Sequence, residues 1–519
     1  MQASPGSPAA PAEVAPPAAT ADASAASAST ASGSGDSHGV VRNTLYLTLA
    51  QVVTIPLALA ANAMAGWFLG PEEFGYMYQA MALCALAMLA LEWGHSGAIP
   101  AFVARDKASA ATVLGTSFVW RLGMALPLGI VIALLCWAVN YGTPLRWTIA
   151  LAFPLAIVNS LGNGLKDTIR GFERTDIPAK AHVAQQGLMF VLVLPVLALG
   201  GHLRSMLLAY FGISVVVLLY LLRALRPLAK APLSYDKTKL KPLLVSGTPF
   251  VFFGLAMVAQ PYLDSLFLSK LAPPKVIGWY GVAQRLTGQL IFPASALIGA
   301  LYPTLCRLKD ENHAEFVRVT RNALYGVSLL AFPAAIGCGL FPELGVMIYG
   351  RAKFAGAESD LRVLSGFLFL VYFSMPLGTC VLAAGRQRAW TIVQCISISI
   401  SCTFVPLLIP YFQRTHGNGA LATCWGIVLG ELLIVVCGLA LSPRGVFDRG
   451  LAKSMALSAL AGLVMIGLAL LTKPISLFLA VPVSVLGYAL TAYFTGAIEP
   501  STVDKVRGAL GRKFARFAR

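Results

Sequence analysis

About fourteen long apolar stretches, separated by short polar segments, fill the chain from Thr44 to Ile498. Each is close to the roughly 20 residues that an α-helix needs to cross the hydrocarbon core of a bilayer. The sequence therefore predicts an all-α polytopic membrane protein with about 14 transmembrane helices. We place the spans at about 44–69, 76–93, 112–139, 147–165, 182–200, 206–225, 243–269, 277–305, 319–341, 361–384, 389–411, 418–441, 452–471 and 475–498.

The basic residues of the chain fall mainly into alternate loops between these stretches. If the N-terminus is cytoplasmic, 28 of the 39 lysines and arginines lie on the inner side, nine lie in outer loops, and Arg121 and Arg285 lie within spans. Inner loops of membrane proteins carry an excess of lysine and arginine, so this alternation sets the orientation. We expect both termini to be cytoplasmic.

The composition agrees with a membrane protein, since 57% of the residues are hydrophobic and only 12% are charged. The net charge of +17 is explained by inner-loop lysines and arginines that orient the helices and contact anionic lipid headgroups. A nucleic-acid-binding protein would gather its charge on a folded soluble face, and none is predicted here. We expect membrane lipids and no nucleic acid among the partners.

The two ends of the chain differ in composition from the spans. Residues 1–40 are rich in Ala, Pro, Ser and Gly and carry no lysine or arginine, which predicts a disordered cytoplasmic tail rather than a cleaved signal peptide. Residues 499–519 predict a basic cytoplasmic tail, whose cations around Phe514 and Phe517 favour a short amphipathic helix on the inner surface. An orientation signal alone would explain that tail nearly as well.

The sequence offers no constellation for metal binding or catalysis. The nine cysteines form no C-x-x-C pair, and the six histidines form no cluster, so we predict no metal site and no cofactor. The longest loops have only about twenty residues, too few for a catalytic domain. In the outer loop, Glu343, Glu358 and Asp360 are interpreted as solvated charges, and we expect transport rather than enzyme activity.

A segment of the chain repeats at an offset of about 200 residues. Leu69–Ala80 joins the first two spans and resembles Leu271–Ala283, which joins spans seven and eight, with one residue inserted. Such a repeat predicts two six-helix lobes related by a twofold axis along the membrane normal, with a central cavity between them. The predicted parts are 41–226 (N-terminal lobe), 227–242 (basic linker), 243–441 (C-terminal lobe) and 452–498 (extra helix pair).

Polar side chains within the spans are the candidate functional residues. Such groups normally face a bundle interior or a hydrated cavity, because exposure to lipid is costly. The repeat aligns Asp264 with Asn62, so we expect both at equivalent depth in the cleft. For each residue, an interhelical bond that only holds the bundle together explains its presence as well as ligand contact does. The set comprises Arg42, Asn62, Glu92, Arg121, Asn159, Asn163, Asp264, Gln284, Arg285, Gln289 and Glu431.

Four motifs resemble a known family. FLGPEEFGYMYQA (68–80), IRGFERTDIPAK (169–180), SGTPF (246–250) followed by DSLFLSKLAPPKVIGWYGVAQRLTGQLIFPASALIGALYPTL (264–305), and LAAGRQRAW (382–390) are similar to the polysaccharide transport branch of the multidrug/oligosaccharidyl-lipid/polysaccharide exporter (MOP) superfamily, over about residues 42–438. The resemblance implies a flippase of the bacterial inner membrane for undecaprenyl-diphosphate-linked oligosaccharides, serving O-antigen, capsule or exopolysaccharide synthesis. A polysaccharide polymerase and a chain-length regulator are possible partners. The final helix pair resembles that of the lipid II flippase branch.

Under this interpretation the intramembrane arginines are the expected diphosphate ligands, because a guanidinium forms charge-assisted, bidentate bonds. We assign diphosphate or sugar binding to Arg42, Arg121, Arg285, Asn62, Gln284 and Gln289. Asp264 or Glu431 would couple transport to protons or sodium, and the membrane potential could also drive it. The alternatives are a lipid II flippase, a multidrug or cation antiporter, and a membrane polysaccharide polymerase or ligase.

Overall fold

The computed structural model describes residues 37–497, which are almost entirely helical and contain no strand. This confirms the all-α prediction. The predicted disordered tail, apart from its last residues, and the basic tail from 499 lie outside these residues. The helices are α2 (Ser37–Glu92), α3 (His95–Arg105), η2 (Lys107–Ser109), α4 (Ala110–Ala138), α5 (Thr143–Gly171), α6 (Asp176–Ala198), α7 (Leu203–Leu225), α8 (Lys237–Leu271), α9 (Pro274–Glu311), α10 (His313–Leu340), α11 (Pro342–Met347), α12 (Gly356–Ala383), α13 (Gln387–His416), α14 (Ala420–Leu441), α15 (Arg449–Thr472) and α16 (Leu477–Phe494).

Twelve helical segments of the described chain are long and apolar enough to cross a membrane. The first of them, residues 54–105, contains the second predicted span and the part of the first predicted span from residue 54 onward, because α2 is two helices joined at a kink. The kink is at Gly70, whose φ of 73° and ψ of 177° suit glycine and disfavour other residues. The 35-residue α8 is not among the twelve. A multi-pass membrane protein is thus confirmed, and the count of fourteen stays a prediction.

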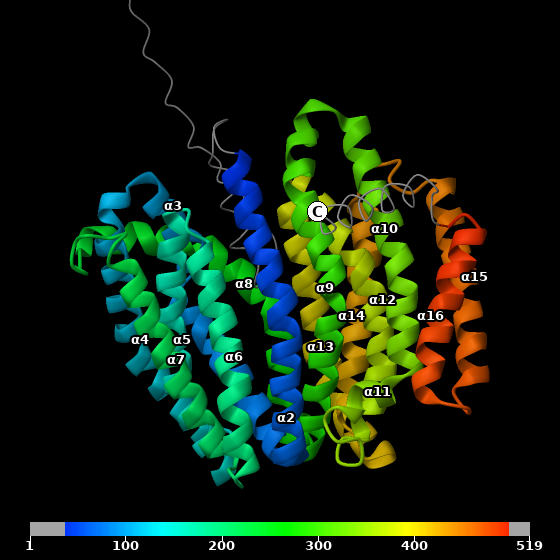
Figure 1. Ribbon diagram of the computed structural model, residues 1–519, viewed down its shortest axis with the longest axis horizontal. Helices are drawn as coiled ribbons and strands as arrows, with labels where there is room; N and C mark the ends of the chain where they lie inside the picture. The colour runs from blue at the N-terminus through cyan, green and yellow to red at the C-terminus, as the bar shows by residue number, and fades with distance from the viewer. Residues whose placement is uncertain (1–36, 498–519) are drawn as a thin grey trace, which may run out of the picture.

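The helices form two groups that stand side by side (Figure 1). One group contains α4–α7, the other contains α9, α10 and α12–α14, and α2 lies between them in this view. We call residues 37–225 the N-lobe and residues 237–441 the C-lobe. The α2 helix packs against α5 and α6 of the N-lobe and against α9 of the C-lobe. The last two helices, α15 and α16, pack on each other and on α10 at the edge of the molecule.

The helices alternate in direction, so that α2 begins and α16 ends at the same end of the array (Figure 1). Many of the lysines and arginines near the ends of helices lie at this end, which we call the basic end. Examples are Lys166 and Arg170 near the end of α5, Arg307 and Lys309 near the end of α9, and Arg386 just before α13. The described termini therefore share a side, as the charge pattern predicts, and its assignment to the cytoplasm stays a prediction.

The two repeated segments meet reciprocally at the opposite end. A Cβ atom on Gly75 of α2 would lie 2.1 Å from the carbonyl oxygen of Pro274, and one on Gly278 of α9 would lie 2.0 Å from that of Pro71. Each repeat thus places its glycine against the proline of the other, as a twofold axis between them requires. Only glycine allows the two backbones to approach this closely.

The α8 helix contacts both lobes along its length. Near its beginning, Leu243 packs in a cluster with Ala98 and Ile99 of α3. Further along, Nε2 of Gln260 donates a hydrogen bond of 3.2 Å to the hydroxyl oxygen of Ser401 in α13. Because α3 belongs to the N-lobe and α13 to the C-lobe, α8 joins the two lobes mechanically.

The segment before α8 is docked on the N-lobe. The hydroxyls of Ser234 and Thr112 in α4 lie 2.9 Å apart, and the backbone N–H of Asp236 donates to the Thr116 hydroxyl at 3.1 Å. A Cβ on Gly115 would lie 2.3 Å from the carbonyl oxygen of Ser234, so the segment sits directly against α4. Part of the predicted linker, residues 227–242, is therefore anchored.

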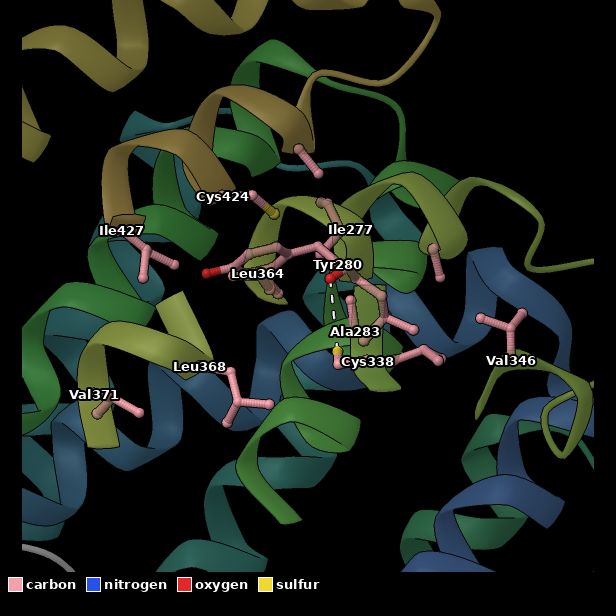
Figure 2. Packing of buried hydrophobic residues seen from close by; sticks show 14 of the residues in the cluster. Ile277, Tyr280, Ala283, Cys338, Val346, Leu364, Leu368, Val371, Cys424 and Ile427 are labelled. Carbon is pink, nitrogen blue, oxygen red and sulfur yellow. Dashed lines mark hydrogen bonds between the residues drawn. The ribbon is translucent and has the colours of Figure 1, made fainter. Parts of the chain in front are cut away.

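The largest apolar core extends from α2 into the C-lobe. Figure 2 shows part of it, with Ile277 and Tyr280 of α9 beside Leu364 of α12 and Cys424 of α14. Buried apolar side chains at close packing density resist deformation, so this core fixes α9, α12 and α14 relative to one another. Gln284 and Arg285 of α9, Ser374 of α12 and Glu431 of α14, described below, are carried by these helices.

Candidate substrate site at the lobe interface and in the C-lobe

Arg285 lies where the two lobes meet. It is about 16 Å along α9 from Pro274, near the middle of a bilayer core of about 30 Å. Its guanidinium carbon lies 5.0 Å from the ring centre of Phe74 in α2. One terminal nitrogen, Nη1, is buried without a hydrogen-bond partner in the described part of the chain. Arg285 therefore keeps an unused donor at the interface.

Aromatic residues close the interface between Arg285 and the opposite end. The ring of Phe74 packs edge-on against Tyr349 and Phe354, with centroids 5.9 and 5.7 Å apart. The same segment is tied to the N-lobe by Lys353, whose ammonium donates to the carbonyl oxygen of Trp67 at 2.9 Å. Together with the glycine contacts, these interactions hold the lobes together at that end.

A cavity of about 310 Å³ lies inside the C-lobe, bounded by α8, α9, α12, α13 and α14. Val371 and Ile427, on one side of the core cluster in Figure 2, form part of its wall. It extends from the middle of the helices to Leu382, the residue before the end of α12 at the basic end. Its lining residues include Gln260, Gln284, Tyr302, Ser374, Thr379, Trp390, Gln394, Ser397 and Glu431.

Two of the predicted site residues line this cavity. Glu431 of α14 accepts a hydrogen bond from the hydroxyl of Ser374 in α12. Gln284 of α9 donates from Nε2 to the hydroxyl of Tyr280 at 2.8 Å. Because Gln284 and Arg285 are consecutive, α9 presents one to the C-lobe cavity and the other to the lobe interface. The structure thus brings Gln284, Arg285 and Glu431 into one region.

Arg121 is placed differently, inside the N-lobe. Its side chain is only 1% exposed. Its Nε donates to the hydroxyl of Ser117 at 3.1 Å, and Nη1 donates to both the hydroxyl, at 3.0 Å, and the carbonyl oxygen of Ser160. The carboxylate of Glu92 lies 4.0 Å from Nη1 and accepts a hydrogen bond of 2.9 Å from Asn163. These bonds join α2, α4 and α5, which favours a structural role.

Of the remaining predicted residues, Asn62, Asp264 and Gln289 do not line the cavity. Asn62 donates to the carbonyl oxygen of Ala58 in its own helix at 2.7 Å. Asp264 is buried in the C-lobe, and its Oδ2 has no hydrogen-bond partner in the described chain. Gln289 is half-buried on α9, one turn after Arg285. The side chain of Arg42 lies outside what the structure describes. The expected pairing of Asn62 with Asp264 stays a prediction.

The interpretation of the outer-loop carboxylates as solvated charges is wrong for two of them. Asp360 is fully buried and accepts a hydrogen bond of 2.8 Å from Asn418. Glu343 is 6% exposed and accepts bonds from Lys473 of 3.0 and 3.2 Å. The sequence did not reveal these partners because they lie more than 50 residues away, beside the ends of other helices.

The sequence analysis also missed three lining residues of α13. Trp390, Gln394 and Ser397 are spaced i, i+4 and i+7, so they share one face of the helix and all reach the cavity. This spacing was the available signal. It is weak on its own, because α13 also carries serines at other positions.

Several solved structures share this fold, and three of them illustrate the similarity. The lipid II flippase MurJ in an inward closed conformation superposes with a TM-score of 0.65 at 12% identity, covering 87% of this chain and 99% of that chain. An inward-facing multidrug resistance MATE family transporter of the MOP superfamily gives 0.62 at 19% identity, with 77% and 97% coverage. An outward-facing MATE family transporter gives 0.50 at 19% identity, with 80% and 96% coverage. The fold is that of the MOP superfamily.

Comparison of the sequence with known protein families assigns the chain to a narrower group than the fold does. A family model described as polysaccharide biosynthesis protein matches residues 40–309, more than half of the chain. The chain therefore belongs to this polysaccharide biosynthesis family, which confirms the resemblance of its motifs to a polysaccharide family, and its fold is the one that the MOP structures share. No curated protein matches the chain.

Proposed function

We propose that this protein is a flippase for undecaprenyl-diphosphate-linked oligosaccharide repeat units. It moves them by alternating access from the cytoplasmic to the periplasmic leaflet of a bacterial inner membrane, for O-antigen, capsule or exopolysaccharide synthesis. Its family supports a polysaccharide pathway, and its fold is shared by a lipid II flippase. Each sugar hydroxyl costs several kcal/mol to bury without a partner, so unassisted crossing of such a lipid is prohibitive.

The main observation behind this proposal is that the guanidinium of Arg285 has no acidic partner in the described chain. A buried cation normally has an acidic partner, yet Arg285 forms no ion pair with any residue that the structure describes and faces Phe74 across the interface. A diphosphate would supply the missing partner, because its oxygens match the planar fork of the guanidinium. Since α9 and α2 belong to different lobes, a diphosphate bound here is released as the lobes separate.

We assign different roles to the other predicted residues. Arg121 positions α4 and α5, while Arg42, Asn62 and Gln289 remain proposed substrate contacts. Asp264 is the favoured site of coupling to a proton or sodium ion, because one of its carboxylate oxygens is buried without a partner. Substitution Asp264→Asn should abolish any dependence of transport on the pH or sodium gradient. Unchanged gradient dependence in that variant would remove Asp264 from the mechanism.

The test of function is deletion of the gene followed by complementation. We expect the deletion strain to lose surface polysaccharide and to hold lipid-linked units in the cytoplasmic leaflet. Arg285→Ala should fail to restore export at wild-type protein level, Arg285→Lys should restore it in part, and the exposed Arg388→Ala should restore it fully. Export at the wild-type rate by Arg285→Ala would contradict the assignment.

The same experiment separates the alternatives. Lysis on depletion indicates lipid II transport, hypersensitivity to cationic drugs indicates a multidrug or cation antiporter, and units stranded in the periplasmic leaflet indicate a polymerase or ligase. The proposed flippase delivers its product where a periplasmic polymerase and chain-length regulator would act. Cross-linking to either protein in cells tests that partnership.

A further inference from the structure

We infer that the cavity inside the C-lobe is a sugar-binding site, which holds the first sugars of the lipid-linked unit beside a diphosphate at Arg285. This inference rests on the proposed function, because it takes the diphosphate to be at Arg285. It adds a second binding position of different chemistry, within one lobe instead of between the lobes.

The cavity offers neutral hydrogen-bonding groups. Three amide side chains, Gln260, Gln284 and Gln394, reach it together with several hydroxyls. An amide both donates and accepts, as a sugar hydroxyl does, so the two are complementary. None of the described residues that line the cavity is a lysine or arginine, and Glu431 would repel phosphate. The site therefore suits the sugar and not the diphosphate.

Several of these groups have hydrogen-bonding capacity to spare. Gln394 makes no hydrogen bond within the described part of the chain, and the hydroxyl of Ser397 is buried without a partner. A buried polar group without a partner costs about 1–3 kcal/mol, which a bound hydroxyl would recover. Glu431 uses one carboxylate oxygen for the Ser374 hydroxyl, so the other remains to accept from a ligand.

An aromatic wall accompanies the polar groups. Trp390 is 5% exposed, and its indole ring packs so closely that a Cβ on Gly378 of α12 would lie 2.5 Å from it. A Cβ on Gly438 of α14 would lie 3.3 Å from the same ring. The ring is thus held rigidly between two helices. The part of this fixed ring that borders the cavity offers an apolar wall to the C–H groups of a sugar, with little loss of conformational freedom.

The position of the cavity matches the covalent structure of the substrate. The Cα atoms of consecutive residues are about 3.8 Å apart, so Gln284 in the cavity and Arg285 at the interface mark neighbouring sites. The first sugar of a lipid-linked unit is bonded directly to its diphosphate. The cavity also extends to Leu382 near the basic end, the side from which we propose the substrate is loaded.

An organic cation is the competing ligand, since Glu431 and Trp390 together could hold one. The balance of the lining favours a sugar, because three amides and several hydroxyls accompany a single carboxylate that already accepts a hydrogen bond. A cation site would require no such donors. The experiment below includes this competitor.

Site-specific photo-cross-linking in proteoliposomes tests the inference. A benzophenone amino acid replaces Gln394 in the cavity or, as control, Leu460, which is 47% exposed on α15 at the edge of the molecule. The probes are radiolabelled undecaprenyl diphosphate with and without one N-acetylglucosamine. We expect the sugar-bearing probe to label the Gln394 position at least tenfold more than the Leu460 position and the sugar-free probe to label both equally weakly. Gln260→Leu should lower the specific labelling about tenfold.

Three results would overturn the inference. Equal labelling at Gln394 by both probes would show that the cavity holds the polyprenyl chain. Flipping of the sugar-bearing probe by the wild-type protein without labelling at Gln394 would place the sugar elsewhere while leaving the flippase function intact. Binding of tetraphenylphosphonium that requires Glu431, without sugar labelling, would assign the cavity to cations. Labelling at Gln394 without flipping would instead contradict the proposed function alone.

Discussion

The two intramembrane arginines differ in what surrounds them, although the sequence makes them look alike. Arg121 is enclosed by Ser117, Ser160 and Glu92, whereas Arg285 lies over the Phe74 ring and forms no ion pair in the described chain. Hydropathy predicts that both lie in the membrane. It cannot predict their partners, because Ser160 lies 39 residues from Arg121 along the chain and reaches it only through helix packing.

This difference predicts opposite effects of substitution at the two arginines. Arg121→Ala removes the guanidinium donor of Ser160 and the cation beside Glu92, and breaking such a buried pair typically costs about 3–5 kcal/mol. We expect its thermal unfolding temperature in detergent to fall, while Arg285→Ala unfolds close to the wild type. An Arg121→Ala protein as stable as the wild type but inactive would show that Arg121 contacts substrate.

At the scale of helices, apolar runs locate the spans well, because burial in lipid dominates their energetics. The short helices α3 and α11 were not predicted, since they cross no bilayer and their apolar residues pack against neighbouring helices. The repeat predicted two related helix pairs. The reciprocal contacts of Gly75 and Gly278 explain why the repeat keeps a glycine before its aromatic residue.

Substitution of these glycines should open the end of the molecule opposite the basic end. In Gly75→Ala or Gly278→Ala the new methyl group meets a carbonyl oxygen, and such overpacking costs about 1–3 kcal/mol. Spin labels at the exposed Arg146 and Arg414, one in each lobe, should report a longer distance. Gly288→Ala in α9 is the control, because nothing lies within 4 Å of its Cβ. An unchanged distance would show that the contact does not hold the lobes.

The attachment of the final helix pair depends on Asp448. Its carboxylate caps α15 by accepting from the backbone N–H of Leu451 at 2.8 Å, and it contacts Arg321 of α10. The Leu451 hydrogen bond, and then the charge of Arg321, hold the pKa of Asp448 below its usual 3.8. A carboxylate whose pKa is lower in the folded state than in the unfolded state stabilises the fold at pH values above its unfolded pKa. The contribution of Asp448 is therefore complete at neutral pH and is lost as the pH falls below about 4.

Asp448→Ala should therefore loosen the beginning of α15. Loss of such a cap costs about 1 kcal/mol, and hydrogen exchange of the α14–α15 segment should rise while that of α4 does not. Asp310→Ala, an exposed carboxylate at the same end, is the control. Exchange equal to that of the wild type would mean that α15 is held by Lys473 and the apolar contacts alone.

At the scale of the whole molecule, the two lobes and their shared interface were predictable from the repeat, but the conformation was not. Whether the interface is closed at one end or the other depends on contacts such as Lys353 with Trp67, which lie 286 residues apart. Several arrangements of the same helices satisfy the hydropathy pattern equally. The closed contacts at the end opposite the basic end support an inward-facing state for the proposed flippase.

Transport of an anionic substrate should depend on the membrane potential. Outward movement of each negative charge is favoured by about 2.3 kcal/mol per 100 mV when the inside is negative. In proteoliposomes with a potassium diffusion potential, flipping of a lipid-linked diphosphate should accelerate with an inside-negative potential and slow when its sign is reversed. A rate that ignores the potential would mean that the substrate crosses with its charge neutralised.

The passage of α8 from the N-lobe to the C-lobe restricts how this chain could be divided. A cut of the chain between α7 and α8 would separate Leu243 from the apolar residues of α3 against which it packs. The first turns of α8 would then be uncovered on the other fragment. Neither fragment would be a self-sufficient unit. Such a split protein should be recovered intact only when both pieces are synthesised in the same cell.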